Sequence, residues 1–183
     1  MKKFEEKTVS TEKIFEGKVI SLQVDVVELP DGNKSKREII KHPGAVAIIA
    51  ITAENKIIMV EQYRKAMDRS IVEIPAGKLE KGEEPVHTAV RELEEETGYE
   101  SEWMEHITSF YTSPGFADEI VHLYFAHNLR KKENAAPCDE DEFVEVYELS
   151  LEEAELYMKE GRICDAKTAY AVQYLQLRKA LEL

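Results

Sequence analysis

Four of the five residues at positions 92–96 are glutamates, and three of them, Glu92, Glu95 and Glu96, are spaced so that they could act together. On a helix, residues four positions apart lie on the same face, so Glu92 and Glu96 would point the same way, with Glu95 at the edge of that face. Grouped carboxylates suit a hard divalent cation such as Mg²⁺, which is commonly completed by waters and substrate phosphates. An isolated acidic run is usually a solvated surface, so the flanking residues must decide.

The flanking residues form a spaced pattern. Gly77 is followed after five residues by Glu83, and after seven more by Arg91, which opens the run Arg-Glu-Leu-Glu-Glu-Glu-Thr-Gly ending at Gly98. This spacing resembles the signature of the Nudix hydrolases, with Tyr99 standing at its closing aliphatic position. The resemblance covers the chain from about residue 42 to its end.

The resemblance implies an α/β/α sandwich around a mixed sheet, in the α/β (α+β) class, and Mg²⁺-dependent hydrolysis of a nucleoside diphosphate linked to another group. It implies two or three ions, with Mn²⁺ as a substitute. Carried over residue by residue, the metal ligands are Glu92, Glu96 and the carbonyl of Ala76, and Glu95 assists catalysis. Four box residues have structural roles: Gly77, Glu83, Arg91 and Gly98.

A second motif indicates the substrate. Pro114 lies sixteen residues beyond Gly98, inside Ser113-Pro114-Gly115. Taken alone this is only a turn signal. In its context it resembles the ADP-ribose pyrophosphatase branch of the family, which implies that the backbone of Ser113 to Gly115 approaches the ligand and that Glu119 reaches the terminal ribose.

A second acidic cluster occupies residues 139–142, just before the expected strand 144–149. By composition it is an exposed acidic loop. In the ADP-ribose branch, a loop of this kind supplies the general base and a further metal ligand. The resemblance therefore assigns Glu140 as the base and Glu142 as the ligand, two roles that neighbouring carboxylates can divide.

Further substrate contacts follow from the same resemblance. Arg64, at the end of an expected strand, would clamp a phosphate, and Lys78 lies beside the box glycine. Arg37 and Glu38 resemble an adenine-ribose contact that the partner subunit of a homodimer can supply. The expected partners are ADP-ribose or a related nucleoside diphosphate sugar and a second copy of the chain.

The sequence also predicts the helices and strands that must position these residues. Pro85 and Gly98 delimit an expected helix over 85–97, with Ala89, Val90 and Leu93 facing the core. Residues 45–52 form a short continuous apolar run, as in a buried strand. Further strands are expected at 19–29, 34–42, 56–63, 71–74, 107–111, 120–126 and 144–149. Two helices are expected from residue 151 onward, separated at Gly161.

This order of strands and helices predicts a mixed sheet covered by helices. We expect residues 1–41 to form an antiparallel β segment that dimerises and contacts adenine, and residues 42–183 to form the hydrolase domain. An unpaired strand edge in the first segment is the physical reason to expect a dimer.

Composition limits the possible functions. The 183 residues are 43% hydrophobic and 33% charged, as in a soluble globular protein, and the net charge is −13. An acidic chain lacks the basic surface that nucleic acid requires. Because no apolar run is long enough for a membrane span and no apolar signal segment opens the chain, we expect a cytoplasmic protein.

These expectations converge on hydrolysis of ADP-ribose to AMP and ribose 5-phosphate. Two alternatives remain open. One is a broader hydrolase of nucleoside diphosphate sugars or oxidised nucleotides. The other, of a different class, is a catalytically silent Nudix-like module that binds nucleotides or proteins, although such modules normally lose box glutamates and all four are present here.

Overall fold

The structure is a computed structural model that describes residues 3–132 and 143–181. Its backbone contacts divide the chain into two compact units. The first, here called the N-terminal unit, comprises Met1–Gly44 and Phe110–Ile120. The second, here called the core unit, comprises Ala45–Ser109 and Val121–Leu183. Each unit is described by itself.

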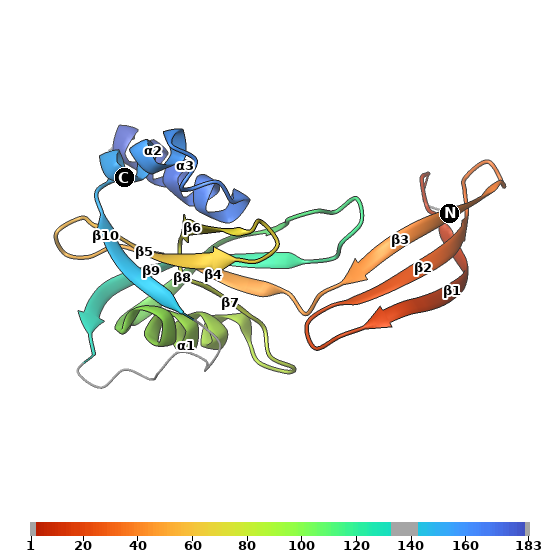
Figure 1. Ribbon diagram of the computed structural model, residues 1–183, viewed down its shortest axis with the longest axis horizontal. Helices are drawn as coiled ribbons and strands as arrows, with labels where there is room; N and C mark the ends of the chain where they lie inside the picture. The colour runs from red at the N-terminus through yellow and green to blue at the C-terminus, as the bar shows by residue number, and fades with distance from the viewer. Residues whose placement is uncertain (1–2, 133–142, 182–183) are drawn as a thin grey trace. The chain divides into compact units, whose positions relative to one another are not determined.

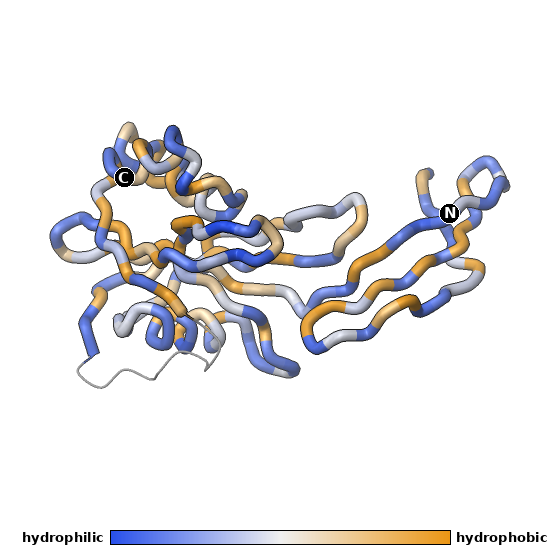
Figure 2. Tube along the Cα trace, in the orientation of Figure 1, coloured by the Kyte–Doolittle hydropathy of each residue, from blue (hydrophilic) through white to orange (hydrophobic). Residues whose placement is uncertain are grey.

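The N-terminal unit is a three-stranded antiparallel sheet in the order β1-β2-β3 (Figure 1). The strands are β1 (Lys7–Glu16), β2 (Ser21–Glu28) and β3 (Lys34–Lys41). The hairpin expected around residues 30–33 connects β2 to β3, and Gly32 adopts the positive φ of 85° that its turn requires. Apolar and polar residues alternate along these strands, as Figure 2 shows.

The core unit has strands between helices on both sides (Figure 1). One sheet runs β10-β5-β6 and the other β7-β4-β9-β8, with β4 parallel to β9 and antiparallel to β7. The elements are β4 (Ala45–Ala50), β5 (Ile57–Arg64), β6 (Arg69–Glu73), β7 (Ala76–Lys78), α1 (Pro85–Thr97), β8 (Tyr99–Tyr111), β9 (Ile120–Lys131), β10 (Val144–Leu149), α2 (Leu151–Lys159) and α3 (Ala166–Ala180). The expected mixed sheet covered by helices is confirmed.

The centre of the core is β4, where five of six residues are fully buried. Its neighbours β7 and β9 flank it in the sheet, so both edges of β4 are paired. On one side its side chains pack with Ala89 and Leu93 of α1 and with Met104 and Tyr124. Helix α1 is therefore fixed against the strand next to β7, where the glycine box begins.

Helix α1 has the bounds that its sequence predicts. Pro85 opens it, and Gly98 ends it in the left-handed conformation at φ 72°, where its N–H donates to the carbonyl of Glu94. The expectation that Val90 faces the core is wrong. Val90 is 40% exposed, whereas Glu92 and Glu96 are buried. The helix turns these carboxylates toward β7 because apolar contact is concentrated at Ala89 and Leu93.

Three strands differ from the sequence expectation. β7 has only three residues and no apolar pattern, and it was not expected. β1, with every residue exposed, lacks a buried face that would mark it in the sequence. β8 begins at Tyr99 directly after α1, although only its last five residues were expected. The two C-terminal helices occur as expected, and no helix in the described part of the chain is long and apolar enough to cross a membrane.

Candidate active site

The close approach of Glu92 to Gly77 is the tightest feature of the box. A Cβ atom placed on Gly77 would lie 1.8 Å from the carboxyl carbon of Glu92 and 2.0 Å from its Oε1. Only glycine leaves room for a carboxylate against the backbone of β7. The box glycine thus creates the space that the first acidic side chain of α1 occupies.

Glu96 meets the same short strand one residue earlier. Its Oε2 accepts a hydrogen bond from the N–H of Ala76 at 2.9 Å. Glu92 and Glu96 are only 8% and 4% exposed. Two buried carboxylates, one helical turn apart, therefore converge on Ala76 and Gly77, the residues for which the sequence predicts a carbonyl ligand and a structural glycine.

Arg91 balances part of this negative charge. Its guanidinium donates to Glu92 at 2.9 Å, to Glu95 at 2.8 Å and to Glu83 at 3.3 Å. Burial lowers the pKa of the Arg91 guanidinium, but the hydrogen bonds to Glu83 and Glu95 outweigh burial and raise its pKa above the usual value. Arg91 thus joins Glu83, Glu92 and Glu95 in one ionic network.

Glu95 lies at the edge of the acidic face. It lines a hollow of about 340 Å³ on the outer side of α1, together with Arg91, His87, Val90 and Glu94. Glu95 is thus more accessible than Glu92 or Glu96, in keeping with an assisting role rather than with a buried ligand.

The donor set fits a hard divalent cation. Carboxylate oxygens held beside a backbone glycine are ligands that Mg²⁺ accepts. In the described ranges, no three His, Cys, Asp or Glu side chains are gathered as a formed metal-binding group. One oxygen each of Glu92 and Glu95 accepts from Arg91, and one oxygen of Glu96 accepts from the N–H of Ala76. Glu140 and Glu142 lie outside the described residues.

Two basic residues expected to contact substrate flank the box. Arg64 ends β5, and its Nε donates to Oε2 of the buried Glu73 at 2.6 Å. Lys78 ends β7 with its side chain exposed. Glu73 was not among the residues predicted from the sequence. The signal that could have found it is an acidic residue inside the apolar stretch 71–74, directly before the box.

The predicted substrate loop belongs to the N-terminal unit. The carbonyl of Ser113 accepts hydrogen bonds from the N–H groups of Phe116 and Ala117, so the loop is a tight turn, with Pro114 and Gly115 exposed at its tip. The hydroxyl of Thr112 donates to Oε2 of Glu119 at 2.5 Å. The loop presents its turn outward and holds Glu119 at its base.

Strand β3 anchors this loop. The N–H of Ile40 donates to the carbonyl of Phe116 at 2.7 Å, and the N–H of Asp118 donates back to Ile40 at 3.2 Å. Asp118 also accepts from Lys41 at 2.5 Å and from the N–H of His42 at 2.9 Å. No motif in the sequence predicted that the loop and the N-terminal segment form one unit.

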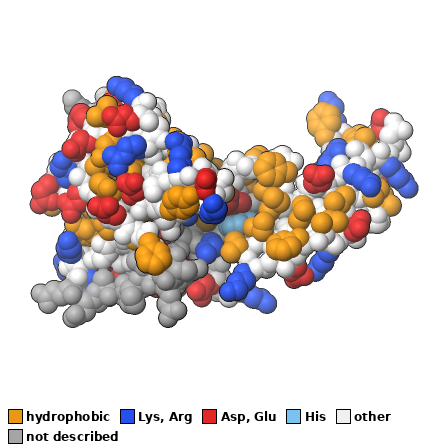
Figure 3. Space-filling view, in the orientation of Figure 1, with side chains coloured by type: hydrophobic (Ala, Val, Ile, Leu, Met, Phe, Trp, Pro, Cys, Tyr) orange, Lys and Arg blue, Asp and Glu red, His pale blue; other side chains and the backbone are white. Residues whose placement is uncertain are grey.

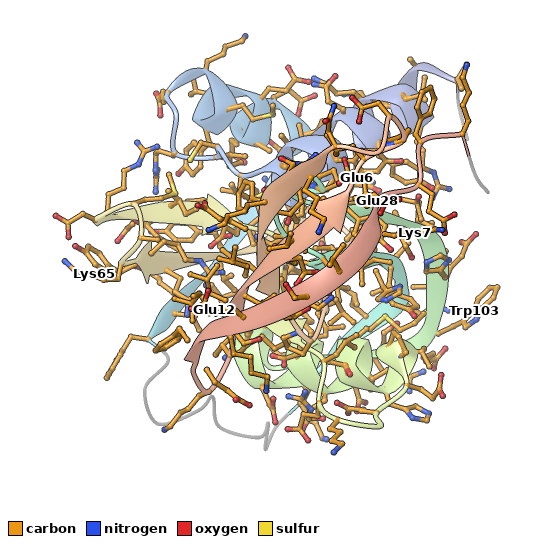
Figure 4. The ribbon with its side chains drawn as sticks, turned by 90° about the vertical axis from the view of Figure 1, so that its right-hand side faces the viewer. Glu6, Lys7, Glu12, Glu28, Lys65 and Trp103 are labelled. Carbon is orange, nitrogen blue, oxygen red and sulfur yellow. The ribbon has the colours of Figure 1, made fainter. Side chains whose placement is uncertain are left out.

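Arg37 and Glu38 lie on β3. Arg37 pairs through two nitrogens with Glu6, at 2.8 Å and 2.6 Å, and Glu38 is exposed. Figure 4 labels Glu6 beside the start of β1. Arg37 therefore fastens the N-terminal end of the chain to β3, and an adenine-ribose contact by this residue would have to replace or share that pair.

Two family models match adjacent stretches of this chain. Residues 41–168 match the family model of the NUDIX domain, and residues 6–40 match that of the nucleoside diphosphate sugar hydrolase N-terminal domain. A methanol dehydrogenase activator of Bacillus methanolicus is 70% identical, over 99% of this chain and 98% of the relative. An ADP-ribose pyrophosphatase of Bacillus subtilis (strain 168) is 63% identical, over 100% of this chain and 98% of the relative.

The fold has a solved counterpart. A crystal structure of an ADP compounds hydrolase superposes with a TM-score of 0.83, covering 97% of this chain and 96% of that one at 16% identity. At that identity the likeness establishes the fold alone.

Proposed function

The chain belongs to the Nudix hydrolase family, and from that premise we propose that it hydrolyses ADP-ribose to AMP and ribose 5-phosphate with Mg²⁺. The observation that carries the metal-dependent chemistry is the convergence of the buried Glu92 and Glu96 on Ala76 and Gly77. The choice of ADP-ribose is supported by the Ser-Pro-Gly turn and by the 63% identical relative of that name.

In this proposal the box residues hold two or three divalent ions, Mn²⁺ being able to replace Mg²⁺. Glu92, Glu96, Glu142 and the carbonyl of Ala76 are the ligands, and Arg91 and Glu83 orient the glutamates. Bound divalent ions neutralise a diphosphate and lower the pKa of a coordinated water. The chain's own part is to fix the carboxylates, clamp the diphosphate through Arg64 and Lys78, and take a proton from water.

The remaining contacts concern the two ends of the substrate. The backbone of Ser113 to Gly115 approaches the ligand, Glu119 binds the terminal ribose, and Arg37 and Glu38 contact the adenosine. The turn supports this role because its tip is exposed while its base is fixed by Thr112 and Asp118.

Glu140 is the proposed general base, with Glu95 as an assisting group. A base acts on the proton in transfer, so Glu140→Gln should lower kcat sharply while the affinity for substrate and metal persists. A ligand acts through the ion, so the loss of activity in Glu142→Gln should be partly recovered at higher Mg²⁺. Measuring kcat against Mg²⁺ for both variants separates the roles, and full kcat in Glu140→Gln would move the base elsewhere.

A homodimer in the cytoplasm completes the proposal. Support for the dimer comes from β1, an edge strand whose residues are all exposed, and from apolar side chains on and around it. Figure 3 shows such side chains over the three-stranded sheet. They include Phe4, Val9, Ile14, Phe15, Val19 and Ile20. Edge strands with apolar surface are usually paired or covered.

The test is a panel of nucleoside diphosphate sugars and oxidised nucleotides, assayed with Mg²⁺, with Mn²⁺ and with chelator. We expect ADP-ribose to have the highest kcat/KM and chelator to abolish turnover. Equal rates across the panel would favour the broader hydrolase, which the match of residues 6–40 to a nucleoside diphosphate sugar hydrolase model keeps open. No hydrolysis of any compound would favour the silent binding module.

A second candidate function rests on the 70% identical methanol dehydrogenase activator. We propose that this chain also activates an alcohol dehydrogenase. Adding wild-type protein or Glu92→Gln to a methanol dehydrogenase assay tests the idea and its dependence on the box. Stimulation by wild type alone would link activation to hydrolysis, and stimulation by both would indicate a binding effect. An unchanged dehydrogenase rate with wild type would exclude the second function.

A further inference from the structure

Glu73 is a buried acid that the proposed reaction does not use. It is the last residue of β6, lies three positions before Ala76 and is 3% exposed. Its Oε2 accepts from Nε of Arg64 at 2.6 Å, and its Oε1 accepts from Nζ of Lys167. Each carboxylate oxygen thus has its own cation, as a buried charge requires.

Lys167 is itself fixed by the first turn of α3. Its Nζ donates to Oδ1 of Asp165 at 3.0 Å, and the same oxygen accepts from the N–H of Thr168 as the helix N-cap. The hydroxyl of Thr168 accepts from the buried N–H of Ile74 at 3.0 Å. The start of α3 is therefore bonded to both Glu73 and the residue after it, on the segment that leads into the box.

The guanidinium of Arg64 is bonded to Glu73 through Nε, and part of its side chain is exposed to solvent. Among the described residues it makes its hydrogen bond through Nε, and 39% of its side chain is exposed. Burial lowers its pKa, but Glu73 and the nearby Glu96 and Asp165 outweigh burial and raise it. The guanidinium is tied to the box through the chain, because its partner Glu73 lies three residues before Ala76.

We propose that Glu73, braced by Lys167, is a positioning residue that holds Arg64 through Nε and so presents the two terminal nitrogens of its guanidinium to the substrate diphosphate. The planar guanidinium can bind an acid with one edge and a phosphate with the other. The inference rests on the proposed function, because Arg64 is assigned there as the phosphate clamp. Lys167, which lies more than 100 residues after Arg64 in the chain, acts on Arg64 only through Glu73.

The benefit of this arrangement is preorganisation. A long side chain that is fixed before binding loses less rotamer freedom when the phosphate arrives. The clamp grips the diphosphate in the ground state and in the transition state alike. Such uniform binding affects KM and leaves kcat nearly unchanged. This split distinguishes positioning of Arg64 from a general structural role, which would lower the amount of active protein and hence kcat.

The decisive test is a double-mutant cycle on the full chain with Mg²⁺. The probe is an ADP-ribose analogue whose bridging oxygen is replaced by methylene, and its Kd is measured by calorimetry. Glu73→Gln and Arg64→Lys should each weaken binding about tenfold, the scale of one charge-assisted hydrogen bond. Because both act on the same contact, the double variant should bind within about twofold of Arg64→Lys. Multiplying losses, of about a hundredfold, would overturn the proposal.

Lys167 provides the second arm. Lys167→Met should raise the Kd and the KM severalfold at nearly unchanged kcat, and Lys167→Arg should restore both. The matched control is Lys179→Met on the same helix, whose ion pair with Glu152 is solvent-exposed. It should leave the Kd unchanged. Equal Kd values for Lys167→Met and Lys179→Met would remove Lys167 from the proposal.

Two further measurements check that the variant is folded and separate failure of the positioning role from failure of the proposed function. Thermal unfolding reports whether Glu73→Gln is folded, and if it is not, Glu73→Asp replaces it, since the shorter side chain keeps the charge but draws it away from Nε. Glu73→Asp should show the same loss of affinity. If wild type neither binds the analogue nor hydrolyses ADP-ribose, the proposed function fails. If wild type does both and Glu73→Gln binds normally, only the positioning role fails.

Discussion

Glu92 and Glu96 are costly residues to bury one helical turn apart, because their like charges repel and their burial removes hydration. Arg91 and the N–H of Ala76 offset part of that cost. A divalent cation would offset more, so the folded protein should favour the metal-bound state. The carboxylates that are proposed to hold the metal should therefore make the protein less stable when metal is removed.

This balance gives a prediction for Glu96→Gln. Glutamine keeps an oxygen that can accept from the N–H of Ala76 but removes the repulsion with Glu92, so the variant should unfold at a higher temperature than wild type in chelator. Mg²⁺ should stabilise wild type and not the variant. Turnover should fall by about two orders of magnitude or more, the scale of losing one charge-stabilising group.

Thermal unfolding with Mg²⁺ and with chelator, together with steady-state kinetics, checks this. The exposed Glu100→Gln, just beyond the helix, is the matched control and should behave as wild type. Near-normal Mg²⁺-dependent turnover in Glu96→Gln would contradict the metal assignment.

Gly77→Ala tests the space that Glu92 occupies. An added Cβ would lie 1.8 Å from the carboxyl carbon, a distance that forces the carboxylate away from β7. We expect activity to fall by at least tenfold, with a higher Mg²⁺ requirement, because a displaced ligand loses coordination geometry. Gly115→Ala, where a Cβ meets nothing within 4 Å, is the control for the metal requirement. An unchanged Mg²⁺ requirement in Gly77→Ala would show that Glu92 is not a ligand.

Elements that combine apolar periodicity with a defined start and stop were predictable from the sequence. Helix α1 begins at Pro85 and ends before Gly98, as these residues indicate. The buried run at 45–50 and the strand at 144–149 also appear where they were expected. What periodicity could not supply is the rotation of α1. The sequence favours Val90 as a core residue, whereas packing selects Ala89 and Leu93 and turns Glu92 and Glu96 inward.

Contacts between segments distant in sequence were not predictable either. β7 exists because β4 supplies its hydrogen bonds, and nothing in its three residues indicates a strand. Likewise, the loop 112–119 is fixed by bonds to β3, more than 70 residues earlier. Pairing of this kind depends on chain topology, which a single sequence shows only weakly.

Asp118 should make the loop sensitive to acid. Burial raises the pKa of its carboxyl, but the hydrogen bonds from Lys41 and from the N–H of His42 outweigh burial and lower the pKa below its ordinary 3.8. For a group with a lowered pKa, the stabilisation is complete above the ordinary value and is lost as the pH falls through the lowered one. The anchor should therefore hold at neutral pH and weaken below about pH 4.

Hydrogen exchange of the amides in residues 112–119 measures this anchor. Asp118→Asn should exchange faster there at neutral pH, whereas Asp31→Asn, in the β2–β3 turn of the same unit, should leave the loop unchanged. An NMR titration of the Asp118 carboxyl gives the direction of the pKa shift independently. Equal protection of the loop in Asp118→Asn and wild type would mean that the backbone bonds to Ile40 suffice.

At the scale of the whole molecule, an acidic protein with net charge −13 is proposed to bind an anionic substrate. The basic residues near the box offset this field only in part, since Arg64, Arg91 and Lys167 are all paired with carboxylates and Lys78 is a single exposed charge. Most of the positive charge that attracts a diphosphate to the proposed contacts of Arg64 and Lys78 would therefore come from bound cations. It follows that removal of metal should impair substrate binding as well as turnover.

The surface of the N-terminal unit is the other whole-molecule feature, because it combines an open strand edge with exposed apolar side chains. Trp103, 65% exposed and labelled in Figure 4, also projects from an edge strand, β8 of the core unit, but it is a single side chain stacked on His127, whereas several exposed apolar side chains gather on and around β1. We therefore place the predicted dimer contact at β1. Ile14→Glu, in the full chain, puts a charge into that surface and should convert the dimer to a monomer.

Light scattering coupled to size exclusion measures this change, and Lys13→Glu is the matched control because Lys13 is the neighbouring residue and is also exposed to solvent. Ile14 stands at an irregularity in the β1–β2 register, so its replacement leaves the paired residues of β1 intact. If the partner's N-terminal residues contact adenine, the monomer should have a raised KM for ADP-ribose. Its kcat should change little, because the box and its carboxylates lie in the core unit. A wild-type monomer, or a monomeric variant with the wild-type KM, would contradict an active site shared between two chains.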